Sequence, residues 1–346
     1  MLTISRSRRI LIGSISLVFI ALTGALLWSF YEPPRTQNPE SGIDLFPPEE
    51  IPYDLLSDIK EEYSLNISSS FSGCEVYIPA EALCVMVEKY AEEMKCSFQG
   101  YGDYDGRLEL ISEALLLDEA AQTAKYGLRP KNQKQIVTPL YSLVFQCVVR
   151  KNSGIHSLAD LRNKRVAVGG RFSEEEMLTR EILRLHGLEY ADFEPVYLDL
   201  EDATMAMEAA EIDCIAAHSA LPSKLIARMS ANFDILLLPL EEPGLIEDPG
   251  GALPGYEVVT IPAQTYKGMD RYILTVATEV LLAAERETKM IVTYEVIKAL
   301  YDHMIECKSI FPLDREIRID RLNEKYPVSF HQGAVKYYWE REFIWN

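Results

Sequence analysis

The sequence predicts an α/β protein whose doubly wound sheets form two lobes. Apolar strand-like segments alternate with helical segments along most of the chain, with short links, and this rhythm is typical of sheets covered by helices. A length of 346 residues exceeds one ordinary core and indicates two lobes or domains. A third observation is a glycine pair, Gly169-Gly170, between a strand and a helix. Open α/β sheets bind ligands at such junctions.

The first half of the chain is expected to contribute three strands and two helices. The strand at 137–149 is long and strongly apolar, which places it at the centre of a sheet. A polar loop, GYGDYDG, separates the second strand from the second helix. In chain order we expect a strand at 65–70, a helix at 80–93, a strand at 95–99, a helix at 108–125 and the strand at 137–149.

The second half continues the same alternation. An acidic segment rich in proline and glycine, 241–255, interrupts it as a surface loop or a hinge crossing. The expected strands are 165–168, 193–198, 214–217, 233–238, 258–261 and 276–282, and the expected helices are 157–162, 174–186, 200–210, 289–307 and 334–341.

The junction after the strand at 165–168 has the architecture of a ligand cradle with an unusual charge. Free N–H groups and the helix dipole point to this position in open α/β sheets. Here Arg171 stands just before Ser173, the expected N-cap, and Glu174, Glu175 and Glu176 follow inside the helix.

Composition excludes several classes of function. The net charge of −19 argues against nucleic acid as a partner, because phosphate binding needs a basic face. No Ser/His/Asp or Cys/His arrangement has a convincing context, so we expect a protein that is not an enzyme. No C-x-x-C or Cys/His cluster predicts a metal, and residues 103–106 fail the spacing of a calcium loop. We expect no cofactor.

The amino terminus has the pattern of a membrane segment, so residues 1–31 are assigned to a signal anchor. Three arginines precede an uncharged run at 10–31, which reaches the roughly 20 residues needed to cross a bilayer. The positive flank keeps that end in the cytoplasm, so the remainder is exported. An uncleaved anchor is favoured because the end of the run has no A-x-A-like site, and a cleaved signal peptide is the alternative. Residues 32–64 then form an extracytoplasmic tether.

Six cysteines in an exported chain are candidates for disulfide bonds. Cys84 and Cys96 lie twelve residues apart, around an expected helix and the strand after it, and we predict that they form a disulfide. Cys147 and Cys214 lie in apolar strands and have the context of small buried hydrophobic residues.

Several segments in one order resemble the TAXI family, the extracytoplasmic solute-binding receptors of TRAP transporters. The similarity runs with gaps from about Leu65 to Glu342. The segments are SFSGCEVYIPAEALC, LYSLVFQCVVRKNSGIHSLADLRNKRVAVGG, EILRLHGL, AEIDCIAAHSALPSK, LLLPL, IPAQTYKGMDRYILTVAT and HQGAVKYYWERE.

The resemblance implies a type II periplasmic-binding-protein fold with two α/β lobes that close on a small organic acid or amino acid. Lobe one would comprise residues 65–146 and 258–342, and lobe two residues 147–240. The resemblance also supports the Cys84–Cys96 disulfide, since paired cysteines are familiar there in the family. It implies membrane permease subunits of a TRAP transporter as partners, and a place on the periplasmic side of the inner membrane.

The loops that would hold the ligand depart from the family pattern. Where members carry TGSxGG, this chain reads SFSGCE at 70–75, and the loss of paired glycines reduces the approach of backbone N–H groups. The second loop, usually TGGS, reads YGDY at 101–104, and the third, usually GSGT, reads FSEE at 172–175. The residues expected to face the ligand are Ser70, Ser72, Glu75, Tyr101, Arg107, Gln122, Arg171 and Ser173.

The charged residues of these loops have two interpretations. Arg107 and Arg171 can each fork two hydrogen bonds to a ligand carboxylate and so replace the lost backbone cradle. They can equally form ion pairs with nearby acids and lock the lobes together. Glu174–Glu176 are ordinary for the first turn of a helix, yet a carboxylate there can also occupy the place of a ligand carboxylate.

The leading hypothesis is a membrane-tethered binding protein that captures a small solute by lobe closure and passes it to a TRAP permease. The alternative is a membrane-anchored sensor or scaffold that kept the fold and lost transport. The missing glycines and the uncleaved anchor favour this alternative.

Overall fold

A computed structural model describes residues 63–69, 74–91, 93–101, 108–126, 134–306, 326 and 328–341. One sheet of ten strands runs through this region in the order β2-β1-β3-β10-β4-β7-β5-β6, with β8 paired to β4 and β9 paired to β10. The strands are β1 (Tyr63–Ser69), β2 (Met94–Tyr101), β3 (Leu108–Ser112), β4 (Lys134–Arg150), β5 (Arg165–Ala167), β6 (Glu194–Val196), β7 (Cys214–Ser219), β8 (Ile235–Leu238), β9 (Glu257–Ile261) and β10 (Ile273–Glu285).

Helices follow most strands, as the alternating pattern predicts, so the α/β class is confirmed. Several begin at a serine or aspartate whose side chain accepts a backbone N–H of the first turn, which is how an N-cap fixes a helix start. The helices are α2 (Cys74–Tyr90), α3 (Glu113–Tyr126), the 3₁₀ helix η2 (Leu158–Leu161), α4 (Glu174–Leu185), α5 (Leu200–Glu208), α6 (Lys224–Asn232), α7 (Pro243–Glu247), α8 (Pro249–Ala252), α9 (Met290–Tyr301) and α12 (Gln332–Glu340).

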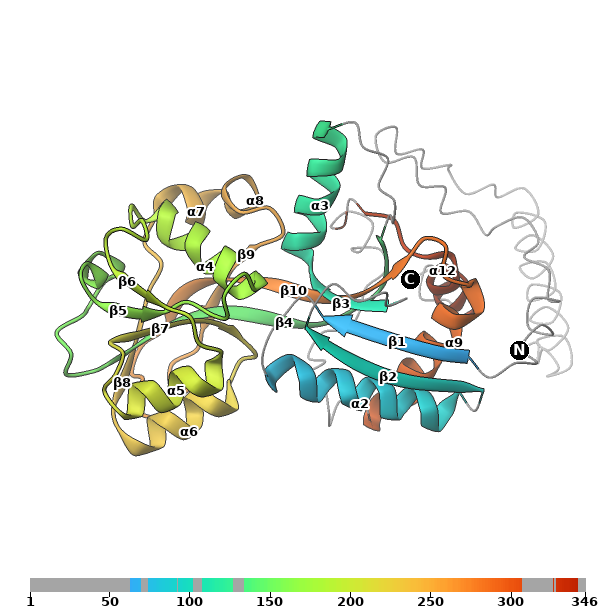
Figure 1. Cartoon of the computed structure of the whole chain (residues 1–346), viewed down its shortest axis with the longest axis horizontal. Coiled ribbons are helices and arrows are strands. Elements are labelled where there is room, and N and C mark those ends of the chain that lie inside the picture. The colour runs from blue at the N-terminus through green and yellow to red at the C-terminus, as the bar shows by residue number, and fades with distance from the viewer. Residues whose placement is uncertain are drawn as a thin grey trace, which may run out of the picture. The chain divides into compact units, whose positions relative to one another are not determined.

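Two long antiparallel strands, β4 and β10, connect two lobes (Figure 1). The half of β10 that follows Val280 pairs with β3, which is parallel to β1 in the first lobe. The half of β4 that follows Val144 pairs with β7 and β8 of the second lobe, where β5 is parallel to β6 and β7. Both lobes therefore contain parallel strands, and the two connecting strands run antiparallel to their neighbours.

The core divides into three clusters of buried side chains. One fills the first lobe around β1, α2, α9 and α12. The second lobe has one cluster on each face of its sheet, and residues of β4 alternate between them. Phe145 and Cys147 pack on the α4 face, whereas Val144 and Val148 pack on the α5 and α6 face, as the two-residue period of a strand requires.

The clusters divide the chain differently from the expected lobe boundaries. Ile261, Tyr266 and Ile273 pack with α5 and α6 of the second lobe, although residues 258–342 were expected in the first. The reason is the pairing of β9 with the first half of β10, which keeps both segments on the second lobe. The chain crosses back within β10 and not before β9.

Two sequence predictions of secondary structure were wrong. Residues 108–112 were expected to begin a helix, but they form β3, which is inserted between β1 and β10 with four of its five residues buried. No element was expected between 217 and 233, yet α6 lies there. Ser223 caps it, and Leu225, Ile226 and Met229 form its buried stripe. The expected loop at 241–255 also holds the short helices α7 and α8.

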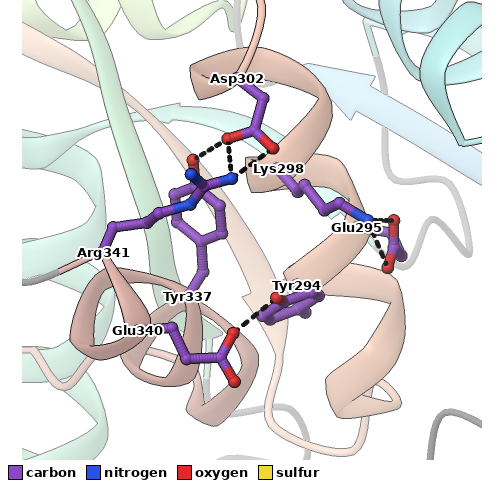
Figure 2. A network of polar contacts seen from close by, with 7 residues as sticks. All are labelled: Tyr294, Glu295, Lys298, Asp302, Tyr337, Glu340 and Arg341. Atoms are coloured by element: carbon purple, nitrogen blue, oxygen red, sulfur yellow. Dashed lines mark hydrogen bonds and ion pairs between the residues drawn. The ribbon is translucent and has the colours of Figure 1, made fainter.

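Helices α9 and α12 pack together on the first lobe through a polar network (Figure 2). Asp302 accepts hydrogen bonds from Tyr337 (2.8 Å) and from Arg341 (2.5 Å). Tyr294 donates to Glu340 at 2.6 Å. Burial raises the pKa of Tyr337, and its hydrogen bond to Asp302 raises it further. The phenol therefore stays protonated and remains a donor.

The predicted disulfide between Cys84 and Cys96 is present, with 4.9 Å between their Cα atoms. Cys147 and Cys214 are free thiols, fully buried, with their sulfur atoms 3.3 Å apart. This burial agrees with their expected role as small hydrophobic residues.

The predicted membrane segment at 1–31 lies outside the described residues, as does the tether up to residue 62. Within the described part of the chain, no helix has both the length and the apolarity to span a bilayer. Tyr63 and Ser64, expected in the tether, belong to β1.

Candidate functional site

The starts of α3 and α4 meet where the two lobes touch. Ser112 ends β3, and its hydroxyl accepts a hydrogen bond from the backbone N–H of Leu115 (3.0 Å), so it caps α3. Ser173 follows β5 and caps α4 in the same way, accepting from the N–H of Glu176 at 3.3 Å. Both serines are fully buried. Each lobe thus directs the positive end of one helix toward the boundary.

A carboxylate from the second lobe bridges these two helix starts. The Ser112 hydroxyl donates to Oε1 of Glu174, the first residue of α4. Glu174 is only 3 % exposed, which is unusual for a charged side chain. The positive ends of two helices stabilise a negative charge in this position. The bridge therefore joins the lobes through a buried, charge-assisted hydrogen bond.

The glycine junction predicted as a cradle does bring the chain close to α4. Gly169 has φ +98°, and a Cβ on it would lie 3.0 Å from the backbone nitrogen of Glu176, so glycine is needed here. Phe172, between the junction and the N-cap, also has a positive φ, +65°, and its side chain is 75 % exposed. A bulky residue in this backbone region is strained, and such strain concentrates at functional sites.

A second contact joins the lobes beside the first. Gly255 of the second lobe has φ +80°, and a Cβ there would lie 2.5 Å from the backbone nitrogen of Ala114 in α3. Ala114 is itself buried in the cluster on the α4 face of the second lobe. Its N–H lies 3.4 Å from the hydroxyl of Thr278 on β10. The first turn of α3 is therefore seated in the other lobe, and the lobes are closed at this point.

Tyr256 and His218 form a buried polar pair behind that contact. The Tyr256 hydroxyl lies 3.1 Å from Nε2 of His218, at the end of β7. Burial lowers the pKa of His218 to about 3, so its imidazole is neutral at physiological pH. Burial also raises the pKa of Tyr256, and the charges of Glu174 and Glu175 raise it further. Both groups are held in their uncharged forms.

A cavity of about 320 Å³ lies next to the lobe boundary. Three of its lining side chains are carboxylates, and the described residues that line it include no lysine or arginine. The lining residues are Glu113, Leu117, Gly250, Pro254, Gly255, Tyr256, Glu257, Ala277 and Glu279. A larger hollow of about 540 Å³ is lined by residues 239–247 and 271–274, all from the second lobe, so it is not between the lobes.

The predicted ligand residues are only partly within the described region. Ser70, Ser72 and Arg107 lie outside it. Glu75 lies in the first turn of α2, Tyr101 ends β2 and Gln122 lies in α3, and the side chains of all three are outside the description. Their roles stay predictions.

Arg171 and Ser173 can be placed in full. The Arg171 guanidinium lies 4.1 Å from the centre of the Tyr197 ring, in a cation–π contact within its own lobe. Ser173 is used as the cap of α4. The roles expected for Arg171 and Ser173 toward a ligand stay predictions.

Four residues at the boundary were not predicted. Ser112 was missed because residues 108–125 were assigned to one helix, although a serine just before Glu113 is a recognisable N-cap signal. Gly255 and Tyr256 lay in or next to the segment 241–255, which was interpreted as a loop, and no sequence pattern indicates a partner for His218. Only pairing in three dimensions brings these residues to the boundary.

Comparisons with solved structures give distant similarities. MatC from Rhodopseudomonas palustris with bound malate is 13% identical, with 81% of this chain and 96% of that chain covered and a TM-score of 0.49. The periplasmic aliphatic sulphonate binding protein SsuA from Escherichia coli is 14% identical, with 80% and 78% covered and a TM-score of 0.38. A TctC solute binding protein from Polaromonas is 12% identical, with 81% and 97% covered and a TM-score of 0.40.

The sequence profile of the NMT1-like family matches residues 110–341, more than half of the chain. This span runs from β3 through α12 and includes both connecting strands and the lobe boundary. The chain belongs to the NMT1-like family.

Proposed function

We propose that this chain is an extracytoplasmic solute-binding protein that captures a small organic solute by closure of its two lobes. The observation that carries the proposal is the meeting of α3 and α4, one from each lobe, at a boundary spanned by only two long strands among the described residues. Two lobes connected in this way can hinge, and contacts made by both lobes to one guest stabilise the closed state.

The finer assignment is a TAXI-type receptor of a TRAP transporter. The order of segments from 65 to 342 supports it, since these segments resemble that family along nearly all of the exported region. The receptor would remain on the periplasmic side of the inner membrane through an anchor at 1–31 and would deliver its solute to membrane permease subunits. Membrane extraction and N-terminal sequencing of the mature protein distinguish the anchor from a cleaved signal.

The expected solute belongs to the class of organic acids or amino acids. The predicted contacts from Arg107 and the first loop would hold it beside the cavity at the boundary, whose lining includes Glu113, Glu257 and Glu279.

Thermal unfolding in the presence of amino acids, dicarboxylates and polyamines tests this function. A binding solute should raise Tm in a saturable way, because it stabilises the folded state in proportion to its occupancy. A saturable rise of Tm with a compound from one of these classes is the expected outcome. If no compound of these classes raises Tm, the receptor proposal fails.

A sensor or scaffold is the second candidate, and the Ser112–Glu174 bridge favours it. The bridge is a direct bond between the lobes made by the protein's own residues, which suits a protein that no longer exchanges solute. Deletion of the gene distinguishes the two candidates. Loss of uptake of one solute indicates a transport receptor, whereas unchanged uptake of all tested solutes with an altered transcriptional or assembly phenotype indicates the sensor or scaffold.

A further inference from the structure

Glu174 stands where an open α/β sheet usually offers its anion site. The carboxyl end of β5, the glycine junction and the start of α4 form that place, and backbone N–H groups at a helix start hold carboxylates and phosphates in such positions. In this chain a carboxylate is already there. It belongs to the protein itself.

Glu174 is buried and bonded to the opposite lobe, as the carboxylate of a bound ligand would be and as a surface glutamate is not. The residue is buried, with only 3 % of its surface exposed to solvent. It accepts the hydroxyl proton of Ser112, and Ser112 is the cap of a helix in the opposite lobe. A carboxylate that only improved the first turn of its own helix would need neither burial nor a partner 62 residues away.

The neighbouring acids do not share this position. Glu175 is only half-buried, and Glu176 turns to the other side of α4, where it meets Arg180 and the hydroxyl of Tyr190 (2.7 Å). Glu174 is the glutamate whose hydrogen bond to the opposite lobe is described. The charges of Glu174 and Glu175 both raise the pKa of Tyr256, the next buried group along the boundary.

We infer that Glu174 is a built-in occupant of the anion position between α3 and α4, and that it determines specificity by excluding solute carboxylates from that position. The inference rests on the proposed function for its biological meaning. A solute captured here keeps its own carboxylate, if it has one, away from the starts of α3 and α4. It presents neutral or positively charged groups to this part of the boundary.

Chemical rescue with acetate tests the inference. Glu174→Ala removes the carboxylate and leaves a space next to the Ser112 hydroxyl and the helix starts. Acetate should fill it and raise the Tm of this variant in proportion to its occupancy, by about 2–4 °C for each tenfold rise of its concentration above its Kd. Acetamide, which has nearly the same shape without charge, should have a much smaller effect at equal concentration.

Three controls make the outcome specific. The wild-type chain should show no difference between acetate and acetamide, because Glu174 fills the position. Glu174→Gln keeps the volume and should also show no acetate effect. Glu181→Ala removes an exposed carboxylate of the same helix and should behave as the wild type.

The inference is overturned if acetate and acetamide act equally on Glu174→Ala, or if acetate stabilises the wild type as much as the variant. Should Glu174→Ala be unfolded in buffer, the folded fraction is measured against acetate concentration, and failure to recover folding likewise contradicts the inference. No solute is added in this experiment. Its result is therefore separate from that of the solute screen, which alone tests the receptor function.

Discussion

Carboxylates serve opposite purposes in two regions of this molecule. On the face of the first lobe formed by α9 and α12, Asp302 accepts from Arg341 and Glu340 accepts from Tyr294 (Figure 2), and both carboxylates are partly exposed. At the lobe boundary, Glu174 is buried and accepts from a serine hydroxyl of the other lobe. The first arrangement joins two helices of one lobe. The second joins two bodies that must separate if a guest is to enter.

Burial determines how much stability is lost when a contact of a charged side chain is removed. Water and salt screen an exposed pair, so its loss has a small effect. A buried polar contact has no alternative partner in the closed state, so its loss is larger and depends on whether the lobes are together. The boundary should therefore respond more strongly to substitution than the α9–α12 face does.

The largest effect is expected from Gly255→Ala. The new Cβ would overlap the backbone of Ala114 and would also occupy a positive φ, so we expect the free energy of unfolding to fall by about 3 kcal/mol. Urea unfolding measures it. Gly154→Ala is the matched control, because Gly154 has a similar φ of +75° with open space around it. If the free energy of unfolding falls equally in both variants, the close contact between Gly255 and Ala114 does not contribute to stability.

Acid should weaken the boundary next. The folded pKa of His218 is lowered to about 3 by burial, whereas the unfolded value is about 6.5. The unfolded chain therefore binds the proton first, and the stability present above pH 6.5 is lost as the pH falls toward 3. At pH 5 the loss from this group is about 2 kcal/mol.

Unfolding measured between pH 7 and pH 5 checks this slope. In His218→Gln the corresponding part of the slope should disappear, since glutamine does not titrate. A variant that loses stability as steeply as the wild type over this range would show that His218 is not the group responsible.

A smaller loss is expected from Glu176→Ala in the second lobe. This carboxylate is 1 % exposed and accepts from Tyr190, so removing it leaves a half-buried phenol without its acceptor. We expect a loss of about 1–2 kcal/mol, mostly from that hydrogen bond, because Arg180 is about half exposed to solvent. Thermal unfolding of this variant and of Glu176→Gln distinguishes the two contributions, since glutamine still accepts from Tyr190.

The smallest effect should come from the α9–α12 face. Asp302→Ala removes the acceptor of Arg341 and Tyr337, yet the arginine is about half exposed. The expected loss is about 1 kcal/mol or less, and it should shrink further in 1 M salt. A loss larger than that of Glu176→Ala would reverse the comparison between the outer face and the interior.

Much of the architecture was predictable because strand and helix periodicity are local signals. The strand at 137–149 and the helix at 174–186 were placed within a few residues of β4 and α4, since burial on both faces and an N-cap serine leave clear patterns. β3 was missed because five apolar-rich residues before a helix have no period of their own. Only its insertion between β1 and β10 makes it a strand.

The site was less predictable because its contacts join distant parts of the chain. Ser173 was found through its place after the glycine pair, but its partner region, Ser112, lies 61 positions earlier in the sequence. Gly255 looks like any loop glycine until α3 is packed against it. Arg171 was predicted from its place on a loop expected to face the ligand, and no local pattern indicates that it stacks on Tyr197.

The seat of Ala114 in the second lobe has a kinetic consequence. Separation of the lobes exposes this methyl group and the apolar surface around it to water, which disfavours the open form. A guest then enters only after the lobes have separated at this contact. The observed rate of association should consequently level off at high solute concentration, at a plateau equal to the rate of opening.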